Sequence, residues 1–342
     1  MRILRNLLVL TVVGAALFGV MELLIQTQII DDYSLQILCM AGINIMVALS
    51  LNLISGFTGQ LALGHAGFLA IGAYSTGILL IAHVPFPLAI LGGALITAFL
   101  GFLIGFPALR LRGDYLAIVT LGVGEIIRVL IINLGGITGG SAGLRNIPGY
   151  AQNIMVNNPV AFLWIFPAVF LAVALVANLI GSSHGRTLVS IREDEIASQS
   201  MGVNIFGMKL MSFTVSAFLA GLAGALYAPF IGYLAPGGFD FLRSVFFVII
   251  VVLGGMGSLT GTILSGIGLT FLQEVLRSNA KDWSQAVANL FGNGSGFTVD
   301  LVPMSQVLFG LILILLMIFR PAGLLGTSEL RLTKLFSRRG SR

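Results

Sequence analysis

Long, nearly uncharged apolar runs separated by short polar breaks make up most of this chain. Runs of about 20 apolar residues are long enough to cross the hydrocarbon core of a bilayer as helices. Barrel strands are disfavoured, because they alternate apolar and polar positions in shorter segments. The pattern therefore predicts an all-α, polytopic membrane protein with about ten transmembrane helices. The predicted spans are 7–25, 33–54, 67–82, 87–107, 115–134, 160–180, 210–228, 244–258, 261–277 and 303–319.

Composition supports an integral membrane protein. Hydrophobic residues make up 57% of the 342 positions and charged residues only 9%, whereas soluble domains carry about 25% charged residues. The first apolar run follows Arg2 and Arg5, as in a secretory signal, but Glu22-Leu23-Leu24 is not a small-residue cleavage site. We therefore expect this first helix to be retained.

The distribution of Lys and Arg predicts the orientation. With ten spans and a cytosolic N-terminus, thirteen of the 18 Lys and Arg residues fall in inside segments and four in outside segments. This is the bias that the positive-inside rule describes. Arg243 is counted among the four outside residues, at the end of a predicted loop over 229–243. Both termini are predicted to be cytosolic, and the net charge of +5 is a topology signal rather than a sign of nucleic-acid binding.

Two glycine-rich stretches interrupt the apolar pattern, at 55–67 (SGFTGQLALGHAG) and 253–261 (LGGMGSLTG). Glycine weakens a helix, and irregular backbone at membrane depth survives only where protein buries it or water lines it. Corresponding breaks in two related halves are typical of transport pathways. The chain is therefore predicted to contain two possible halves, each with one break, although the two stretches share little sequence.

Polar residues in and before the first break are candidates for the translocation path. They are Asn52, Gln60, Gly64 and His65. Two interpretations stand: these groups line a pore, or they tie broken helix ends together.

Glu125 and Arg128 are a second pair of candidates inside a predicted span. Ionisable residues in a membrane are costly and indicate function by default. Their i,i+3 spacing also lets them face and neutralise each other. A direct role in substrate passage and simple mutual neutralisation are both consistent with this pattern.

The sequence contains no catalytic constellation. His65, His83 and His184 are far apart, and no HExxH, paired-cysteine or nucleophile-elbow motif occurs. None of the three lysines follows a glycine-rich phosphate loop. We expect a chain that is not an enzyme, binds no metal or cofactor and does not hydrolyse ATP itself.

The longest charged segment, 181–209, lies between two predicted spans. Residues 192–202 (REDEIASQSMG) suit a short helix, with acidic residues near its positive end and Gly202 to stop it. Ile196, Ala197, Ser200 and Met201 would share one face. A small apolar face on a loop helix fits a groove on a partner protein. The alternative is a helix on the bilayer surface, which usually has a more basic polar face.

Three ordered blocks of the sequence resemble a known transporter family. They are SGFTGQLALGHAGFLAIGAY at 55–74, IREDEIASQSMGVNIFGMKLMSFTVSAFLAGLAGALYA at 191–228, and FRPAGLLG at 319–326. They are similar to permease subunits of branched-chain amino acid ABC importers of the LivM type. The resemblance runs from about residue 33 to residue 326.

The resemblance implies that Glu195, Ala197 and Gly202 match the family's Glu-x-Ala coupling element followed by glycine. The spacing departs from the general Glu-Ala-Ala-x3-Gly form, since Ile196 stands where the first Ala would be. The segment would then be the helix that fits a cleft on an ATPase. The residues expected to couple to the ATPase are Arg192, Glu193, Asp194, Glu195, Ile196, Ala197, Met201 and Gly202.

The resemblance further implies a heteromeric importer in a bacterial cytoplasmic (inner) membrane. Its other parts would be a second homologous permease, ABC ATPase subunits that bind ATP and Mg, and an extracytosolic substrate-binding protein that supplies most of the selectivity. Membrane lipid would surround the permease, and its own path would be weakly selective. A urea or short-amide importer permease and a secondary transporter using Glu125 are the alternatives.

The expected organisation is one membrane unit with two extensions. Residues 1–32 would form an N-terminal helix and outside loop. Residues 33–320 would form the permease domain, with its cytosolic coupling loop at 181–209. Residues 321–342 would form a basic cytosolic tail.

Overall fold

The computed structural model describes residues 31–111, 113–151, 154–291 and 310–311. Over these residues the secondary structure is helical, apart from one isolated β-bridge between Leu144 and Leu234. The helices are α2 (Asp32–Asn52), α3 (His65–Ile81), α4 (Phe86–Ala108), α5 (Asp114–Asn133), α6 (Gly135–Thr138), α7 (Ile154–Gly181), α8 (Ser183–Glu193), α9 (Glu195–Ser200), α10 (Ile205–Ile231), α11 (Phe241–Gly254) and α12 (Leu259–Phe291), with a π-helical turn η1 (Leu53–Phe57) and 3₁₀ turns η2 (Gly140–Ala142) and η3 (Pro236–Phe239).

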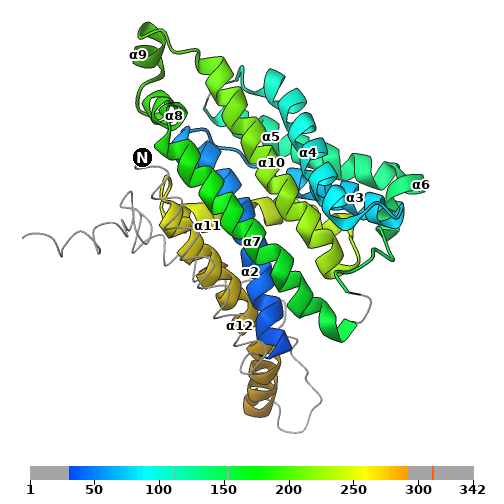
Figure 1. Ribbon diagram of the computed structural model, residues 1–342. Helices are drawn as coiled ribbons and strands as arrows, with labels where there is room; N and C mark the ends of the chain where they lie inside the picture. The colour runs from blue at the N-terminus through cyan, green and yellow to red at the C-terminus, as the bar shows by residue number, and fades with distance from the viewer. Residues whose placement is uncertain (1–30, 112, 152–153, 292–309, 312–342) are drawn as a thin grey trace, which may run out of the picture.

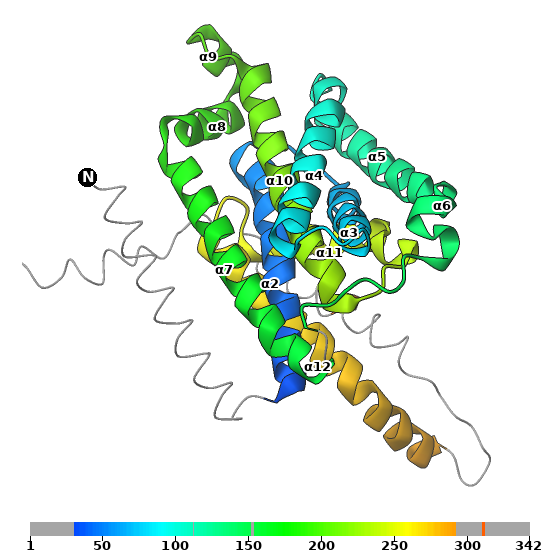
Figure 2. The same ribbon diagram turned by 45° about the vertical axis from the view of Figure 1, so that its right-hand side comes forward.

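The long helices form one bundle around α2. Helix α2 packs against α7, α10, α11 and α12, while α10 packs against α3 and α4 on its other side. Both views place α9 at one end of the bundle and the far end of α12 at the other (Figures 1 and 2). The short helices α8 and α9 therefore project from one end of the described bundle.

Small residues bring α10 close to its neighbours. A Cβ added to Gly72 of α3 would lie 2.2 Å from the carbonyl oxygen of Gly221 in α10. A Cβ on Gly101 of α4 would lie 2.2 Å from the methyl group of Ala217. Such approaches let apolar helices gain packing contacts that larger side chains would prevent.

The predicted all-helical membrane fold is confirmed in its coarser form. Among the described residues, seven helices are long and apolar enough to cross a membrane, and His65–Ile81 is a shorter apolar helix. The predicted spans 7–25 and 303–319 lie outside the described residues. The seven are Asp32–Phe57, Phe86–Ala108, Asp114–Asn133, Asn158–Gly181, Ile205–Ile231, Pro236–Gly254 and Leu259–Asn279.

The bounds of two predicted segments differ from those of the observed helices. The loop at 229–243 is wrong at both ends, because α10 continues to Ile231 and α11 begins at Phe241. Asp240 sets this start, since its carboxylate accepts the backbone N–H of Arg243 (3.0 Å) and caps the helix. The helix predicted as the span 261–277 ends too early, because α12 continues to Phe291.

Candidate functional site

The charged segment after α7 forms two short helices instead of the single helix predicted over 192–202. Asp194 has an extended backbone (φ −156°, ψ 108°), and its carboxylate accepts the N–H groups of Ile196 and Ala197 at 2.9 Å each. A residue that caps a helix in this way lies outside the helical conformation. Arg192 and Glu193 therefore end α8, and α9 begins at Glu195.

Helix α9 presents apolar side chains to its surroundings. Ile196 is 73% exposed and Met201 is 84% exposed, and Ala197 and Ser200 are exposed as well. Gly202 follows with φ +81°, a conformation that favours glycine, and its N–H bonds to the carbonyl oxygen of Gln199 (2.9 Å). Gly202 thus lies where a stop was expected.

Glu195 connects α9 to the start of α10. Its carboxylate accepts a hydrogen bond from Lys209 Nζ at 2.9 Å. The Lys209 side chain is buried, with 7% of its surface exposed, and that of Glu195 is 30% exposed. A buried ammonium needs a partner, so this pair fixes the position of α9 on α10.

Arg192 extends from the end of α8 to the first glycine-rich break. Its Nη1 donates to the carbonyl oxygen of Gly56 (2.8 Å), while its Nε and Nη2 donate to Glu193 Oε1 (3.1 and 2.6 Å). A Cβ on Gly59 would lie 2.7 Å from the Cγ of Arg192, and one on Gly257 would lie 2.9 Å from Nη1. Glycine at 59 and 257 therefore leaves room for this arginine.

The two glycine-rich breaks meet at Asn52. Its Nδ2 donates to the Ser258 carbonyl oxygen (3.0 Å) and to Thr262 Oγ1 (2.9 Å), and its Oδ1 accepts the Gly257 N–H (2.8 Å). Asn52 is fully buried. We call Asn52, Gly56, Arg192, Gly257 and Ser258 the junction, because these residues join both breaks to the α8–α9 segment.

The other residues predicted to line the path, Gln60, Gly64 and His65, lie further along the first break. His65 begins α3, and its Nε2 lies 3.0 Å from Ser216 Oγ, which donates to the Ser50 carbonyl oxygen (2.6 Å). A Cβ on Gly64 would lie 2.0 Å from the carbonyl oxygen of Thr120 in α5. Gln60 is buried. The imidazole of His65 thus links α2, α3 and α10 through hydrogen bonds.

Glu125 and Arg128 lie together on α5, as their spacing predicts. Arg128 Nε donates to Glu125 Oε2 at 2.8 Å, and about a third of each side chain is exposed. Glu125 also lines a cavity of about 10 Å³ with Gly67 of α3 and with Asp240 and Ser244 at the start of α11. The pair is therefore separate from the junction and close to the beginning of α11.

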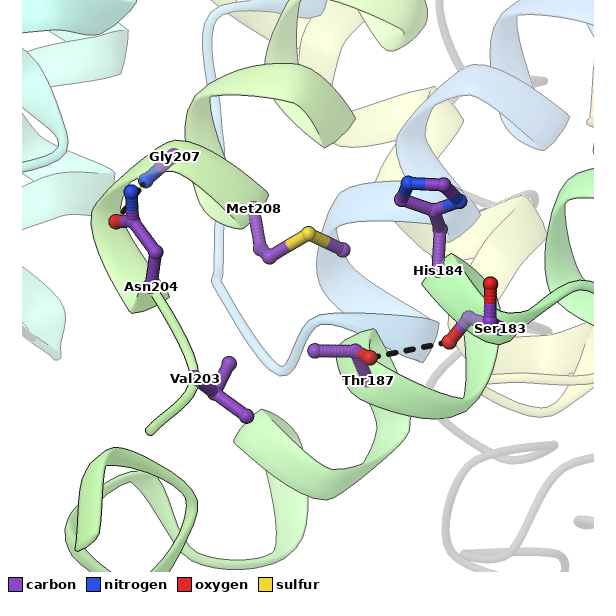
Figure 3. A pocket seen from close by; sticks show the side chains of 7 residues that line it. All are labelled: Ser183, His184, Thr187, Val203, Asn204, Gly207 and Met208. Carbon is purple, nitrogen blue, oxygen red and sulfur yellow. Dashed lines mark hydrogen bonds between the residues drawn. The ribbon is translucent and has the colours of Figure 1, made fainter. Parts of the chain in front are cut away.

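A larger hollow of about 360 Å³ lies between α8 and the start of α10, beside the α8–α9 segment. Figure 3 shows His184 and Met208 projecting from opposite sides of it, with Val203 at its edge. Thr187 Oγ1 bonds to the Ser183 carbonyl oxygen (3.0 Å), and Asn204 Oδ1 accepts the Gly207 N–H (3.0 Å). These bonds hold the two helix starts that form its walls.

Arg243 is a residue whose position the sequence analysis placed wrongly. It was assigned to an outside loop, but it lies in the first turn of α11, within the candidate span Pro236–Gly254. The signal for this placement was available, because Asp240 is a favoured N-cap residue directly before an apolar run.

Comparisons with known proteins agree on one family. The family described as "Branched-chain amino acid transport system / permease component" matches residues 33–317. The LivM high-affinity branched-chain amino acid permease protein of Salmonella typhimurium is 37% identical over 322 residues, covering 85% of this chain and 70% of that protein. A probable LivM of Methanocaldococcus jannaschii is 25% identical, covering 86% of this chain and 93% of that protein. The autoinducer 2 import permease LsrC of Yersinia pseudotuberculosis is 27% identical, covering 77% of each. No solved structure matches significantly.

Proposed function

Because the chain belongs to the family of branched-chain amino acid transport permease components, we propose that it forms the translocation path of an ATP-driven importer for leucine, isoleucine and valine. ABC ATPase subunits would bind and hydrolyse ATP, a second homologous permease would complete the path, and an extracytosolic binding protein would deliver substrate. The importer would lie in the bacterial inner membrane, with both termini in the cytosol. The family match favours this function over a secondary transporter.

The observation that carries the proposal is the apolar surface of α9. Ile196 and Met201 are among the most exposed large apolar side chains of the described residues. Apolar side chains on a short helix that projects from the bundle (Figure 1) fit a groove on a partner. We therefore propose α9 as the coupling helix, with the hollow between α8 and α10 as a second contact for the ATPase.

The junction gives this contact a mechanical route into the membrane part. A shift of α8 or α9 would act on Arg192, which bonds to Gly56 in the first break. Asn52, at the end of α2 just before that break, bonds to Gly257 in the second. Movement of the ATPases would then bias the bundle between inward-facing and outward-facing states. Such coupling needs two packing arrangements that the ATPase binds with different affinity.

The test is purification from native membranes in mild detergent, identification of the co-purifying subunits by mass spectrometry, and reconstitution. We expect an ABC ATPase and a second permease to be recovered. We also expect ATP-dependent uptake of leucine, isoleucine and valine, but not of urea, when the binding protein is supplied. Uptake by the chain alone that follows an ion gradient without ATP would overturn the proposal.

A pair of variants tests the role of α9 directly. Ile196→Asp places a charge on the exposed apolar face and should abolish ATPase recovery and uptake. Gln199→Asp adds the same charge to the same exposed helix away from that face and should retain both. Equal behaviour of the two variants would remove α9 from the docking contact.

A further inference from the structure

One edge of the Arg243 guanidinium group, formed by Nε and Nη2, is buried inside the bundle. Its Nε and Nη2 atoms are inaccessible to solvent, although the residue as a whole is partly exposed. No hydrogen-bond acceptor among the described residues pairs with either atom. Buried charged donors without partners are costly, so their retention calls for a ligand or partner that binds there.

The same edge of two other arginines in this chain binds a carboxylate. Nε and Nη2 of Arg277 donate to Glu274 Oε2 (3.1 Å) and Oε1 (2.6 Å), and those of Arg192 both donate to Glu193 Oε1 (3.1 and 2.6 Å). The contact of Arg277 with both oxygens of Glu274 is the two-point geometry in which arginine recognises a carboxylate most strongly. At Arg243 the corresponding edge is buried and unpaired.

Aromatic rings hold the Arg243 side chain without using this edge. Its Cζ lies 5.8 Å from the ring centroid of Tyr227 and 5.7 Å from that of Phe247. Cation–π contacts of this kind stabilise the charge but accept no hydrogen bond in the plane of the group. Phe239 packs edge-on against Tyr227 at 6.0 Å and is itself buried.

The carboxylate of Asp240, the residue that precedes α11, makes no hydrogen bond to Nε or Nη2 of Arg243. Asp240 Oδ1 accepts the backbone N–H of Arg243 as the helix cap. The first turn of α11 also carries the positive end of the helix dipole. The position is thus suited to a mobile anion, and it lies about 16 Å along α11 from the end that meets the junction.

We propose that the Nε/Nη2 edge of Arg243 binds the carboxylate of the amino acid as it passes through the translocation path, with Tyr227 and Phe247 beside it for the apolar side chain. This inference rests on the proposed function and gives the path its own preference for carboxylates. It differs from the expectation, drawn from the resemblance, that the path itself is weakly selective.

The experiment measures substrate binding by the complete importer in lipid nanodiscs without the soluble binding protein, which would impose its own selectivity. Radiolabelled leucine is the probe. The competitors are 4-methylpentanoate, which has the carboxylate but no ammonium group, and 3-methylbutylamine, which has the amine but no carboxylate. In the wild-type complex we expect 4-methylpentanoate to compete and 3-methylbutylamine not to compete.

The Arg243→Gln variant should weaken leucine binding by about ten- to a hundredfold, the effect of losing a two-point charged contact, and should remove the difference between the competitors. Arg243→Lys, which retains the charge but not the fork, should fall between. Arg145→Gln is the matched control, because Arg145 also lies over a tyrosine ring, Tyr233 at 5.9 Å, but is exposed. It should bind leucine as the wild type does.

The outcomes separate this inference from the proposed function. Wild-type leucine Kd and competitor preference in both Arg243 variants would overturn the inference alone. So would a wild-type complex that imports leucine with its binding protein yet binds none by itself. Failure of the wild-type complex to import any branched-chain amino acid would overturn the proposed function, and this inference with it.

Discussion

Two arginines lie near opposite ends of α11 and differ in their hydrogen bonding: Arg192 of α8 lies beside Gly257 in the loop that follows α11, and Arg243 lies in the first turn of α11. In the junction beyond Gly254, Arg192 bonds to Gly56 and Glu193. Asn52 bonds there to Gly257 and Ser258 of the loop after α11 and to Thr262 of α12. At the start of the helix, Arg243 has aromatic neighbours and a donor edge without an acceptor among the described residues.

The difference distinguishes a polar group whose hydrogen bonds stabilise the packing, Arg192, from one whose donors are available to a ligand, Arg243. A buried network with every member bonded fixes a single arrangement of its helices. A buried charge with unused donors costs stability, and such groups cluster where function requires them. The junction, beyond the last residue of α11, therefore holds helices together. The first turn of α11, which carries Arg243, is the candidate contact for substrate.

The largest effect is expected where the junction has no room. In Gly56→Ala, the new Cβ would lie 1.9 Å from Asn52 Oδ1 and 2.3 Å from the backbone nitrogen of Gly257. Because one of these atoms is backbone, the loops must separate. We expect a loss of more than about 3 kcal/mol, measured as a lower thermal unfolding midpoint in detergent and reduced amounts in the membrane.

Gly122→Ala is the control for that substitution. A Cβ at Gly122, on α5, meets nothing within 4 Å, and alanine is a better helix former by about 1 kcal/mol. This variant should be as stable as the wild type or slightly more stable. Equal losses in both glycine variants would show that the junction is not tightly packed.

A smaller effect on stability, but a large one on transport, is expected from Glu195→Lys. The variant places a second cation beside the buried Lys209, which loses its partner at 2.9 Å. Helix α9 should detach from α10, so that membrane insertion survives while ATP-driven uptake is lost. Uptake of labelled leucine and the amount of protein in the membrane are measured together.

Reversal of the pair tells whether the ion pair itself is needed. The double variant Glu195→Lys with Lys209→Glu restores opposite charges, and we expect it to recover part of the uptake. Normal uptake in Glu195→Lys alone would contradict the role of this residue in coupling. Gly202→Arg offers a second check at the end of α9 and should also abolish uptake.

His65 lies near the start of α11, since its neighbour Ala66 donates its N–H to Ser244 Oγ in the first turn of that helix (3.1 Å). His65→Ala removes the bond to Ser216 and leaves a cavity beside Phe68. We expect a loss of about 1–3 kcal/mol and slower transport with an unchanged order of preference among leucine, isoleucine and valine. A clear change in that order would favour the pore-lining interpretation instead.

Much of this molecule follows from local pattern, and the parts that do not follow depend on long-range contacts. Apolar runs predict the helices over 87–107 and 115–134 to within a residue of their bounds, because length and hydropathy determine a membrane helix. Gly202 ends α9 as expected. The contact of the two breaks could not be predicted, since Asn52 and Gly257 are 205 positions apart.

The two errors in the candidate regions have the same cause. Asp194 and Asp240 are both N-cap residues. The sequence analysis placed Asp194 inside a helix over 192–202 and Asp240 inside a loop over 229–243. Recognising the caps would have started α9 at Glu195 and moved Arg243 into a helix. The aromatic surroundings of Arg243 come from α10 and α11 together, and no local pattern contains them.

The smallest effect is expected at Glu125, on the cavity that also adjoins the start of α11. Its ion pair with Arg128 is about one-third exposed, and such pairs contribute roughly 0–1 kcal/mol. Glu125→Gln should therefore leave stability nearly unchanged and uptake dependent on ATP, because the energy comes from the ATPases and not from protonation of this carboxylate. Uptake is compared with and without ATP and with the ion gradient collapsed. One outcome would contradict this: Glu125→Gln loses uptake, and wild-type uptake follows the ion gradient but not ATP. Glu125 on α5, rather than Arg192 and Arg243, would then be central to transport. Retained ATP-driven uptake would assign Glu125 to mutual neutralisation with Arg128 and leave Arg243 as the charged group best placed to meet the substrate.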